Sequence, residues 1–108
     1  MIMEKIKSPH REKDQGLAFV FRLYITGASP NSSRAITNIK NLFENHLKDQ
    51  YELSIIDVYQ QPHIAKTVDI IALPLLIRKL PLPERRLIGD MSDGEKVIKI
   101  LGLLHHDR

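Results

Sequence analysis

The apolar and polar residues of the first half of the chain follow two different periods. Residues 17–25, LAFVFRLYI, are almost all apolar and rich in aromatic and β-branched side chains, which predicts a central strand covered on both faces. Residues 51–58, YELSIIDV, begin by alternating and end apolar, as a second strand would. Between them, from residue 30 to about residue 48, apolar residues recur at helical spacing. Strand, helix and strand in this order favour a right-handed parallel βαβ unit.

The predicted helix has a clear beginning. Ser29 is a good N-cap, and Pro30 suits the first helical position, where a missing N–H breaks no hydrogen bond. Gly27 in the preceding loop raises the alternative of an anion site at the helix N-terminus. However, the loop lacks the lysine and the serine or threonine spacing of a P-loop, and the helix cap already accounts for its residues.

The second half is marked by prolines in residues 73–90, LPLLIRKLPLPERRLIGD. Proline donates no backbone hydrogen bond and favours extended or turning backbone around it. These prolines are Pro74, Pro81 and Pro83. The segment therefore predicts a short edge strand, a stiff Pro-X-Pro corner and a second short strand that closes at Gly89.

The same segment carries a set of basic residues among its aliphatic ones. They are Arg78, Lys79, Arg85 and Arg86. Cations on a rigid backbone would form a docking face for an acidic partner. The alternative is that they are only the solvent side of an edge hairpin, where lysine and arginine protect against sheet-to-sheet aggregation.

Shorter signals flank the proline-rich segment. Residues 59–62 predict a turn, and residues 63–71 predict a short helix or turn. Ser92 and Glu95 predict a capping box that opens an amphipathic segment. The apolar face of that segment would hold Val97, Ile98, Leu101 and Leu104. Residues 96–101, KVIKIL, are also rich in β-branched side chains and could serve as a strand, so their local preference is divided.

Residues 1–16, MIMEKIKSPHREKDQG, mix charges with a proline and a glycine and show no sustained period. We expect a mobile leader outside the fold, followed by one domain over residues 17–108. An apolar stripe left uncovered in such a small domain would favour a homo-oligomer, either a dimer or a tetramer.

Composition removes several classes of function. Cysteine is absent, which excludes disulfides, thiolate nucleophiles and cysteine-ligated zinc. The 16 lysines and arginines against 13 acidic residues give a formal charge of +3, which favours acidic partners without demanding nucleic acid. No apolar run reaches the roughly 18 residues of a membrane-spanning helix, and no secretory signal is evident, so we expect a cytoplasmic protein.

Two other kinds of site are considered and not predicted. A single-strand nucleic-acid binder would interleave aromatic residues with its basic ones, and the proline-rich segment has none. A metal site could be sought at His105 and His106 with His63 or Asp107, but adjacent histidines point to different sides of a helix. No cofactor site is predicted either.

The order of residues resembles one family closely. The stretches LYITGASPNSSRAITNIKNLFE, IIDVYQQP and ALPLLIRKLPLPERRLIGDMSDGEKVIKILGLL resemble the KaiB family of circadian clock proteins over residues 17–104. This resemblance implies a single α/β domain with the thioredoxin-like order βαβαββα. Residues 27–31 stand where thioredoxins carry their CxxC motif, and Pro74 stands at the thioredoxin cis-proline position.

The resemblance also implies a function and a set of site residues. It implies a protein that is not an enzyme, docks on a KaiC-like hexameric ATPase and regulates its phosphorylation state. The positions that match the family's basic residues are Arg34, Arg78 and Arg85. The implied role of these arginines is contact with acidic residues of the ATPase, because the planar guanidinium pairs with carboxylates in a bidentate way.

KaiB proteins are further known for a second packing, in which the second half rearranges and the chain forms a tetramer. The divided preference of residues 96–101 is a physical reason to expect this here. However, Ile100 and Gly102 replace the family's glycine and aspartate, and the acidic tail is missing. These departures indicate a homologue outside the core oscillator, with a role in stress adaptation or signalling. The alternative is a thioredoxin-like adaptor of a histidine-kinase system that does not bind KaiC.

Overall fold

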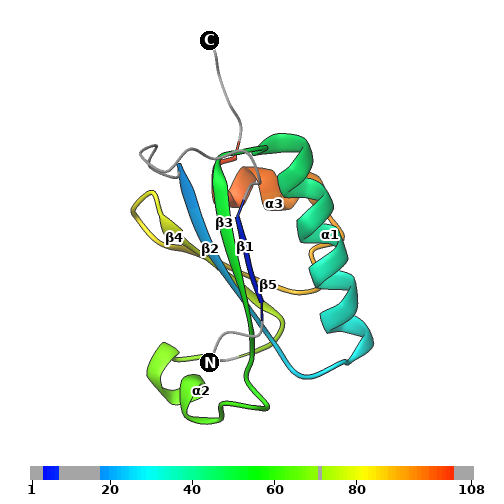
Figure 1. The fold of residues 1–108 in the computed structure, drawn as a ribbon, viewed down its shortest axis with the longest axis vertical. Helices are drawn as coiled ribbons and strands as arrows, with labels where there is room; N and C mark the ends of the chain where they lie inside the picture. The colour runs from blue at the N-terminus through cyan, green and yellow to red at the C-terminus, as the bar shows by residue number, and fades with distance from the viewer. Residues whose placement is uncertain (1–3, 8–17, 71, 104–108) are drawn as a thin grey trace.

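The computed structural model describes residues 4–7, 18–70 and 72–103. Within these residues the chain forms one five-stranded sheet, in the order β1-β3-β2-β4-β5, with three helices (Figure 1). The strands are β1 Glu4–Lys7, β2 Phe19–Ile25, β3 Tyr51–Asp57, β4 Leu75–Leu80 and β5 Arg85–Ile88. The helices are α1 Pro30–His46, α2 His63–Val68 and α3 Gly94–Leu101. After β1, the elements follow the predicted βαβαββα order.

The βαβ unit forms as predicted. β2 and β3 pair in parallel from Phe19 opposite Tyr51 to Ile25 opposite Asp57, and α1 connects them. The side chain of Ser29 accepts a hydrogen bond from the backbone N–H of Ser32, which confirms the predicted N-cap. β2 lies in the middle of the sheet, as its apolar sequence predicted.

The main core lies on the sheet face covered by α1 and α3. The predicted helical stripe is buried there, with Phe43 completely enclosed. The ring of Phe43 packs 4.2 Å from the ring of Phe21 and 5.3 Å from that of Tyr51, measured between centroids. These aromatic contacts tie α1 to both parallel strands.

A smaller core lies on the other face, beneath α2. Ile64, Ala65 and Val68 of this helix pack against a cluster that includes Tyr24 and Leu75. The prediction of a short helix within residues 63–71 is therefore confirmed. The helix ends at Val68 because Asp69 takes a left-handed conformation with φ 61°.

The prediction that residues 75–80 form an edge strand is wrong. β4 lies between β2 and β5 and pairs antiparallel with both, so β5 is the edge strand. The prolines permit this because Pro74 precedes β4 and Pro81 follows it, which leaves every N–H within the strand free to pair. The Leu73–Pro74, Leu80–Pro81 and Leu82–Pro83 peptide bonds are cis, including the one at the thioredoxin cis-proline position.

The leader and the last helix also differ from expectation. The strand β1 forms inside residues 1–16, so the prediction that this range lies outside the fold is wrong for Glu4–Lys7. The free edge of β3 supplies backbone partners that a local sequence pattern does not reveal. Residues 96–101 are helical, and the N-cap of α3 is Asp93 rather than Ser92, since the Asp93 side chain accepts from the N–H of Lys96. Leu104 lies outside the described residues.

Candidate functional site

Of the candidate partner-binding residues, Arg78 and Arg85 lie on the strand pair β4–β5 and Arg34 lies on α1. Arg78 is the one that departs most from expectation. Its side chain is buried, with 7% of the residue exposed. Its Nη1 donates to the carbonyl oxygen of Leu101 at 2.6 Å, and its Nη2 donates to that of Pro83 at 2.7 Å. Arg78 therefore joins the end of α3 to the turn between β4 and β5. It is not available for contact with a partner in this fold.

The burial of Arg78 follows from strand alternation. It lies two residues after the buried Leu76, and so on the same sheet face, which α1 and α3 cover. Gly102 makes room for it, because a Cβ there would lie 3.0 Å from the Arg78 Nη1 atom. Burial, and then the charge of Arg85 directly opposite on β5, lower the pKa of Arg78.

Arg86 and Lys79 are also used inside the molecule. Arg86 donates from Nη2 to the carbonyl of Val68 at 2.7 Å and from Nη1 to that of Asp69 at 3.1 Å. It therefore caps the C-terminal end of α2, where a cation is favourable. Lys79 lies 2.5 Å from a carboxylate oxygen of Glu84, and this hydrogen bond lowers the pKa of Glu84.

Arg85 is the basic residue of β5 that remains open to solvent without a partner. It is exposed, and its side chain forms no hydrogen bond or ion pair with the described part of the chain. Exposed apolar side chains lie nearby, with Leu82 of the β4–β5 turn 72% exposed and Leu80 at the end of β4 45% exposed. A solvent-facing guanidinium next to exposed leucines suits a partner surface that combines acidic and apolar groups.

Arg34 lies on the first turns of α1 and contacts the loop between β5 and α3. Its Nε donates to Oδ2 of Asp90 at 3.3 Å, and it also contacts Asn31. Asn38 donates to the backbone oxygen of Asp90 at 2.8 Å. The hydrogen bonds from Ser92, and then the one from Arg34, lower the pKa of Asp90. Asp90 is thus the point where α1 holds the loop that leads to α3.

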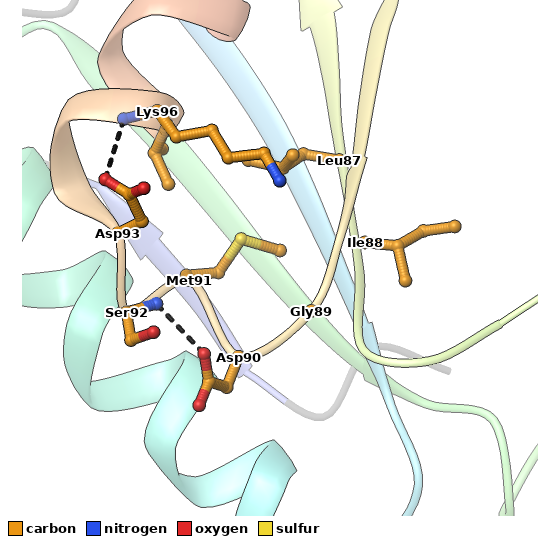
Figure 2. A pocket seen from close by; sticks show the side chains of 9 residues that line it. Leu87, Ile88, Gly89, Asp90, Met91, Ser92, Asp93 and Lys96 are labelled. Carbon is orange, nitrogen blue, oxygen red and sulfur yellow. Dashed lines mark hydrogen bonds between the residues drawn. The ribbon is translucent and has the colours of Figure 1, made fainter.

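A shallow pocket of about 220 Å³ lies behind this loop. Leu87 and the buried Met91 line its apolar part, and Lys96 runs across it toward Leu87 (Figure 2). The carboxylates on its rim already accept backbone N–H groups, Asp90 from Ser92 and Asp93 from Lys96. Their use as caps and turns accounts for them without a chemical role.

Residues 27–31, at the position of the thioredoxin CxxC motif, have a structural role and carry no thiol. Residues 27–31 contain no cysteine, and Ser29 serves as the α1 cap. Asp57 is buried and accepts hydrogen bonds from the N–H groups of Gly27 and Tyr59, both at 2.9 Å. This carboxylate therefore joins the two loops that follow β2 and β3.

The structure does not gather the three predicted arginines into one cluster. Arg78 and Arg85 are direct neighbours across β4 and β5. Arg34 instead contacts Asp90, which follows Arg85 by five residues of chain. Sequence reasoning missed the roles of Arg86 and Asp90. The D-x-S pattern at Asp90 could have indicated a side-chain turn, whereas no local signal pairs Arg86 with α2.

Membrane and metal sites find no support in the part of the chain that the structure describes. None of its helices has the length and apolarity to cross a bilayer. None of its His, Asp or Glu side chains are grouped in threes that could hold a metal ion. Three residues of the metal site that was considered and not predicted, His105, His106 and Asp107, lie outside the described residues.

The chain is similar to known proteins in sequence and in fold. The KaiB domain model matches residues 22–103. The chain is 46% identical over 86 residues to the circadian clock oscillator protein KaiB of Prochlorococcus marinus subsp. pastoris, with 80% of each chain covered. It is 45% identical over 87 residues to the KaiB of Synechococcus elongatus, with 81% of this chain and 85% of that one covered.

Solved structures give the fold class. The N-terminal domain of Synechococcus elongatus SasA matches with a TM-score of 0.66 at 18% identity, covering 90% of this chain and 95% of that one. Mitochondrial thioredoxin 3 of Saccharomyces cerevisiae matches with a TM-score of 0.64 at 15% identity, covering 82% and 80%. The predicted thioredoxin-like fold is confirmed.

Proposed function

This chain belongs to the KaiB family of circadian clock proteins, and from that membership we propose that it binds a KaiC-like hexameric ATPase and modulates its phosphorylation state. The observation that carries the proposal is the family match over residues 22–103, which includes all three predicted contact arginines. The setting would be a circadian clock or an adaptive response to stress, in the cytoplasm. The protein would act by binding and not by catalysis.

Arg85 is the proposed centre of the docking surface. It combines an exposed side chain with exposed leucines at the end of β4 and in the following turn, so an acidic group of the ATPase would meet both a charge and an apolar contact. Arg34 is the proposed second contact, where a carboxylate of the partner would compete with Asp90. Arg78 would act indirectly, by holding β4, the turn and α3 in place.

A mixing experiment tests this proposal. Size-exclusion chromatography with light scattering would be run on the chain alone and with its cognate KaiC-like ATPase plus ATP. We expect the wild-type chain to co-elute with the ATPase and R85E to elute alone, because the substitution reverses the charge at the centre of the surface. Circular dichroism would confirm that R85E keeps its fold.

Arg22 offers a matched control. It is also exposed, but it lies opposite Ile77 on the α2 face of the sheet, whereas Arg85 is on the α1 and α3 face. R22E should therefore still form the complex. Equal loss in both variants would contradict a surface at β5. A wild-type chain that never joins the ATPase would refute the function and leave the thioredoxin-like adaptor of a histidine-kinase system as the better proposal.

The same light-scattering data give the mass of the free chain. We propose a homo-oligomer, a dimer or a tetramer. The rearranged tetrameric packing stays a prediction. It would require α3 to leave its place, and therefore the bond between Arg78 and the carbonyl of Leu101 to open.

A further inference from the structure

Arg78 and Arg85 form a like-charge pair across the strands β4 and β5. They are register partners on the same sheet face, so their side chains are neighbours. Like charges directly opposite each other on adjacent strands destabilise a sheet. The lowered pKa of Arg78 has the charge of Arg85 as its second cause, after burial. A counter-ion between the two side chains would relieve this repulsion.

The buried guanidinium of Arg78 lacks an opposite charge and one hydrogen-bond acceptor. Its two Nη atoms donate to the carbonyl oxygens of Leu101 and Pro83, which are neutral. Its Nε is buried and has no hydrogen-bond partner in the described part of the chain. A buried charge is normally paired with an opposite one, and a buried donor without an acceptor is destabilising. Both deficits would be met by one anion.

The acidic side chains that flank this pair along the chain are bound to other residues. Glu84 forms an ion pair with Lys79, and Asp90 forms one with Arg34. Arg85 itself is exposed and forms no hydrogen bond or ion pair with the described part of the chain. The two arginines therefore keep their charges without a carboxylate from either neighbour.

The guanidinium of Arg78 lies just beneath the surface. Its acceptor Pro83 and its strand neighbour Arg85 are exposed, and so is Gly102. A Cβ at Gly102 would lie 3.0 Å from the Nη1 atom, so the lack of a side chain there leaves this approach uncovered. Arg85 has no hydrogen bond to lose when its side chain moves. A small ion can therefore approach Arg78, whereas a side chain that is only 7% exposed offers no surface to another protein.

We propose that Arg78 and Arg85 together bind one tetrahedral oxyanion of the phosphate type. A phosphate group carries a charge of about −1.5 to −2 near pH 7, which matches two guanidinium groups. Its oxygens can accept from the Nε of Arg78 and from the planar donor fork of Arg85 at the same time. A carboxylate has one charge and two oxygens, so it satisfies the pair less completely. The source is either inorganic phosphate or the phosphate group of a nucleotide.

The bound ion would also steady the end of α3. Arg78 already joins β4 to the carbonyl of Leu101 and to the turn at Pro83. An anion that fixes Arg78 and Arg85 to each other would strengthen this connection, because ligands that bind only the folded state stabilise it. The site goes beyond the proposed ATPase docking, and it can be measured on the free chain.

Titration of the free chain with inorganic phosphate tests the site. The readout is the Nε–H signal of Arg78 in a nitrogen–proton NMR spectrum, with sodium chloride adjusted to keep the ionic strength constant. We expect a saturable shift in the wild type and at least about tenfold weaker binding in R85Q, which removes an exposed cation from the pair. R22Q removes an exposed arginine from the opposite face of the sheet and should bind as the wild type does.

Thermal unfolding gives a second readout with opposite signs for the two conditions. Without phosphate, R85Q should unfold at a higher temperature than the wild type, because the repulsion across β4 and β5 is removed. With phosphate, the unfolding temperature of the wild type and of R22Q should rise, and that of R85Q should not.

Two further ligands define the class and the source of the anion. Acetate should bind more weakly than phosphate, and acetate binding of equal strength would overturn the assignment to a tetrahedral oxyanion. ADP binding more tightly than phosphate would support the site with a nucleotide as its source, and weaker ADP binding would support it with the free ion. A shift that does not saturate, or that is the same in R85Q and the wild type, would overturn the site. No ATPase is present in these experiments, so their failure would leave the proposed function standing.

Discussion

The β2–α1–β3 unit and the β4–β5–α3 region share one apolar core but differ in how far polar contacts add to it. In the first, aromatic and aliphatic side chains pack at full burial, with Phe43 between Phe21 and Tyr51. In the second, Val97 and Leu101 of α3 belong to the same apolar core, but the end of α3 and the preceding loop are also fixed by polar contacts. These run from Arg78 to Leu101 and from Arg34 to Asp90. The stabilisation from apolar packing depends on the total buried area and tolerates small movements. The stabilisation from each of these hydrogen bonds depends on one donor and one acceptor atom. The second region should therefore open alone, and the first only with the whole fold.

The largest effect should follow from a change in the first region. Phe43→Ala removes a completely buried ring from the contact between α1 and both parallel strands. We expect a loss of about 3–5 kcal/mol in the free energy of unfolding, measured by urea denaturation. Asn45→Ala, at an exposed position of the same helix, should change it by less than about 0.5 kcal/mol. Similar losses in both variants would contradict the assignment of the core.

Arg78→Met should have a smaller and more local effect. It leaves the carbonyls of Leu101 and Pro83 without their charged donor, which predicts a loss of about 2 kcal/mol. Hydrogen exchange should increase in α3 and much less in α1. Arg86→Met is the matched comparison, because that arginine bonds carbonyls at the end of α2, so exchange should increase there instead. Equal changes in α2 and α3 for the two variants would contradict these separate roles.

The smallest effect concerns Asp90 and pH. Hydrogen bonds from Ser92 and Arg34 lower the pKa of this carboxyl in the folded state. Its contribution to stability is therefore complete above the unfolded pKa of about 3.9 and is lost as the pH falls through the lower folded value. The urea midpoint of the wild type should decrease over that acidic range, and the decrease should be smaller in Asp90→Asn.

Glu84 must be separated from Asp90 in this titration. Its pKa is also lowered, by Lys79, so it loses stabilisation in the same direction and in the same range of pH. Glu84→Gln should reduce the acid dependence without loosening the contact between α1 and the loop. An Asp90→Asn profile that matches the wild type at every pH would show that the Asp90 contacts do not contribute to stability.

The candidate site was predicted less completely than the fold. Arg34, Arg78 and Arg85 came from a family resemblance, and local sequence could not show that Arg78 is buried while its neighbour Arg85 is exposed. The two occupy the same sheet face, and only the position of α3 distinguishes them. The cap that Arg86 provides to α2 likewise joins residues 17 and 18 positions apart. Such contacts leave no periodic signal in the chain.

By itself, the sequence determined the βαβ unit, the cap at Ser29 and the absence of thiol chemistry. Apolar spacing and helix capping depend on residues close together in the sequence, and the lack of cysteine does not depend on position at all. Only the tertiary structure decided that β4 is an inner strand, that residues 96–101 are helical and that Glu4–Lys7 pairs with β3. In each of these cases the backbone had more than one acceptable local conformation. Contacts with residues distant in the sequence selected one of these conformations. The hydrogen-bonding groups of strand edges, helix ends and buried cations must be paired, and the fold brings their partners close.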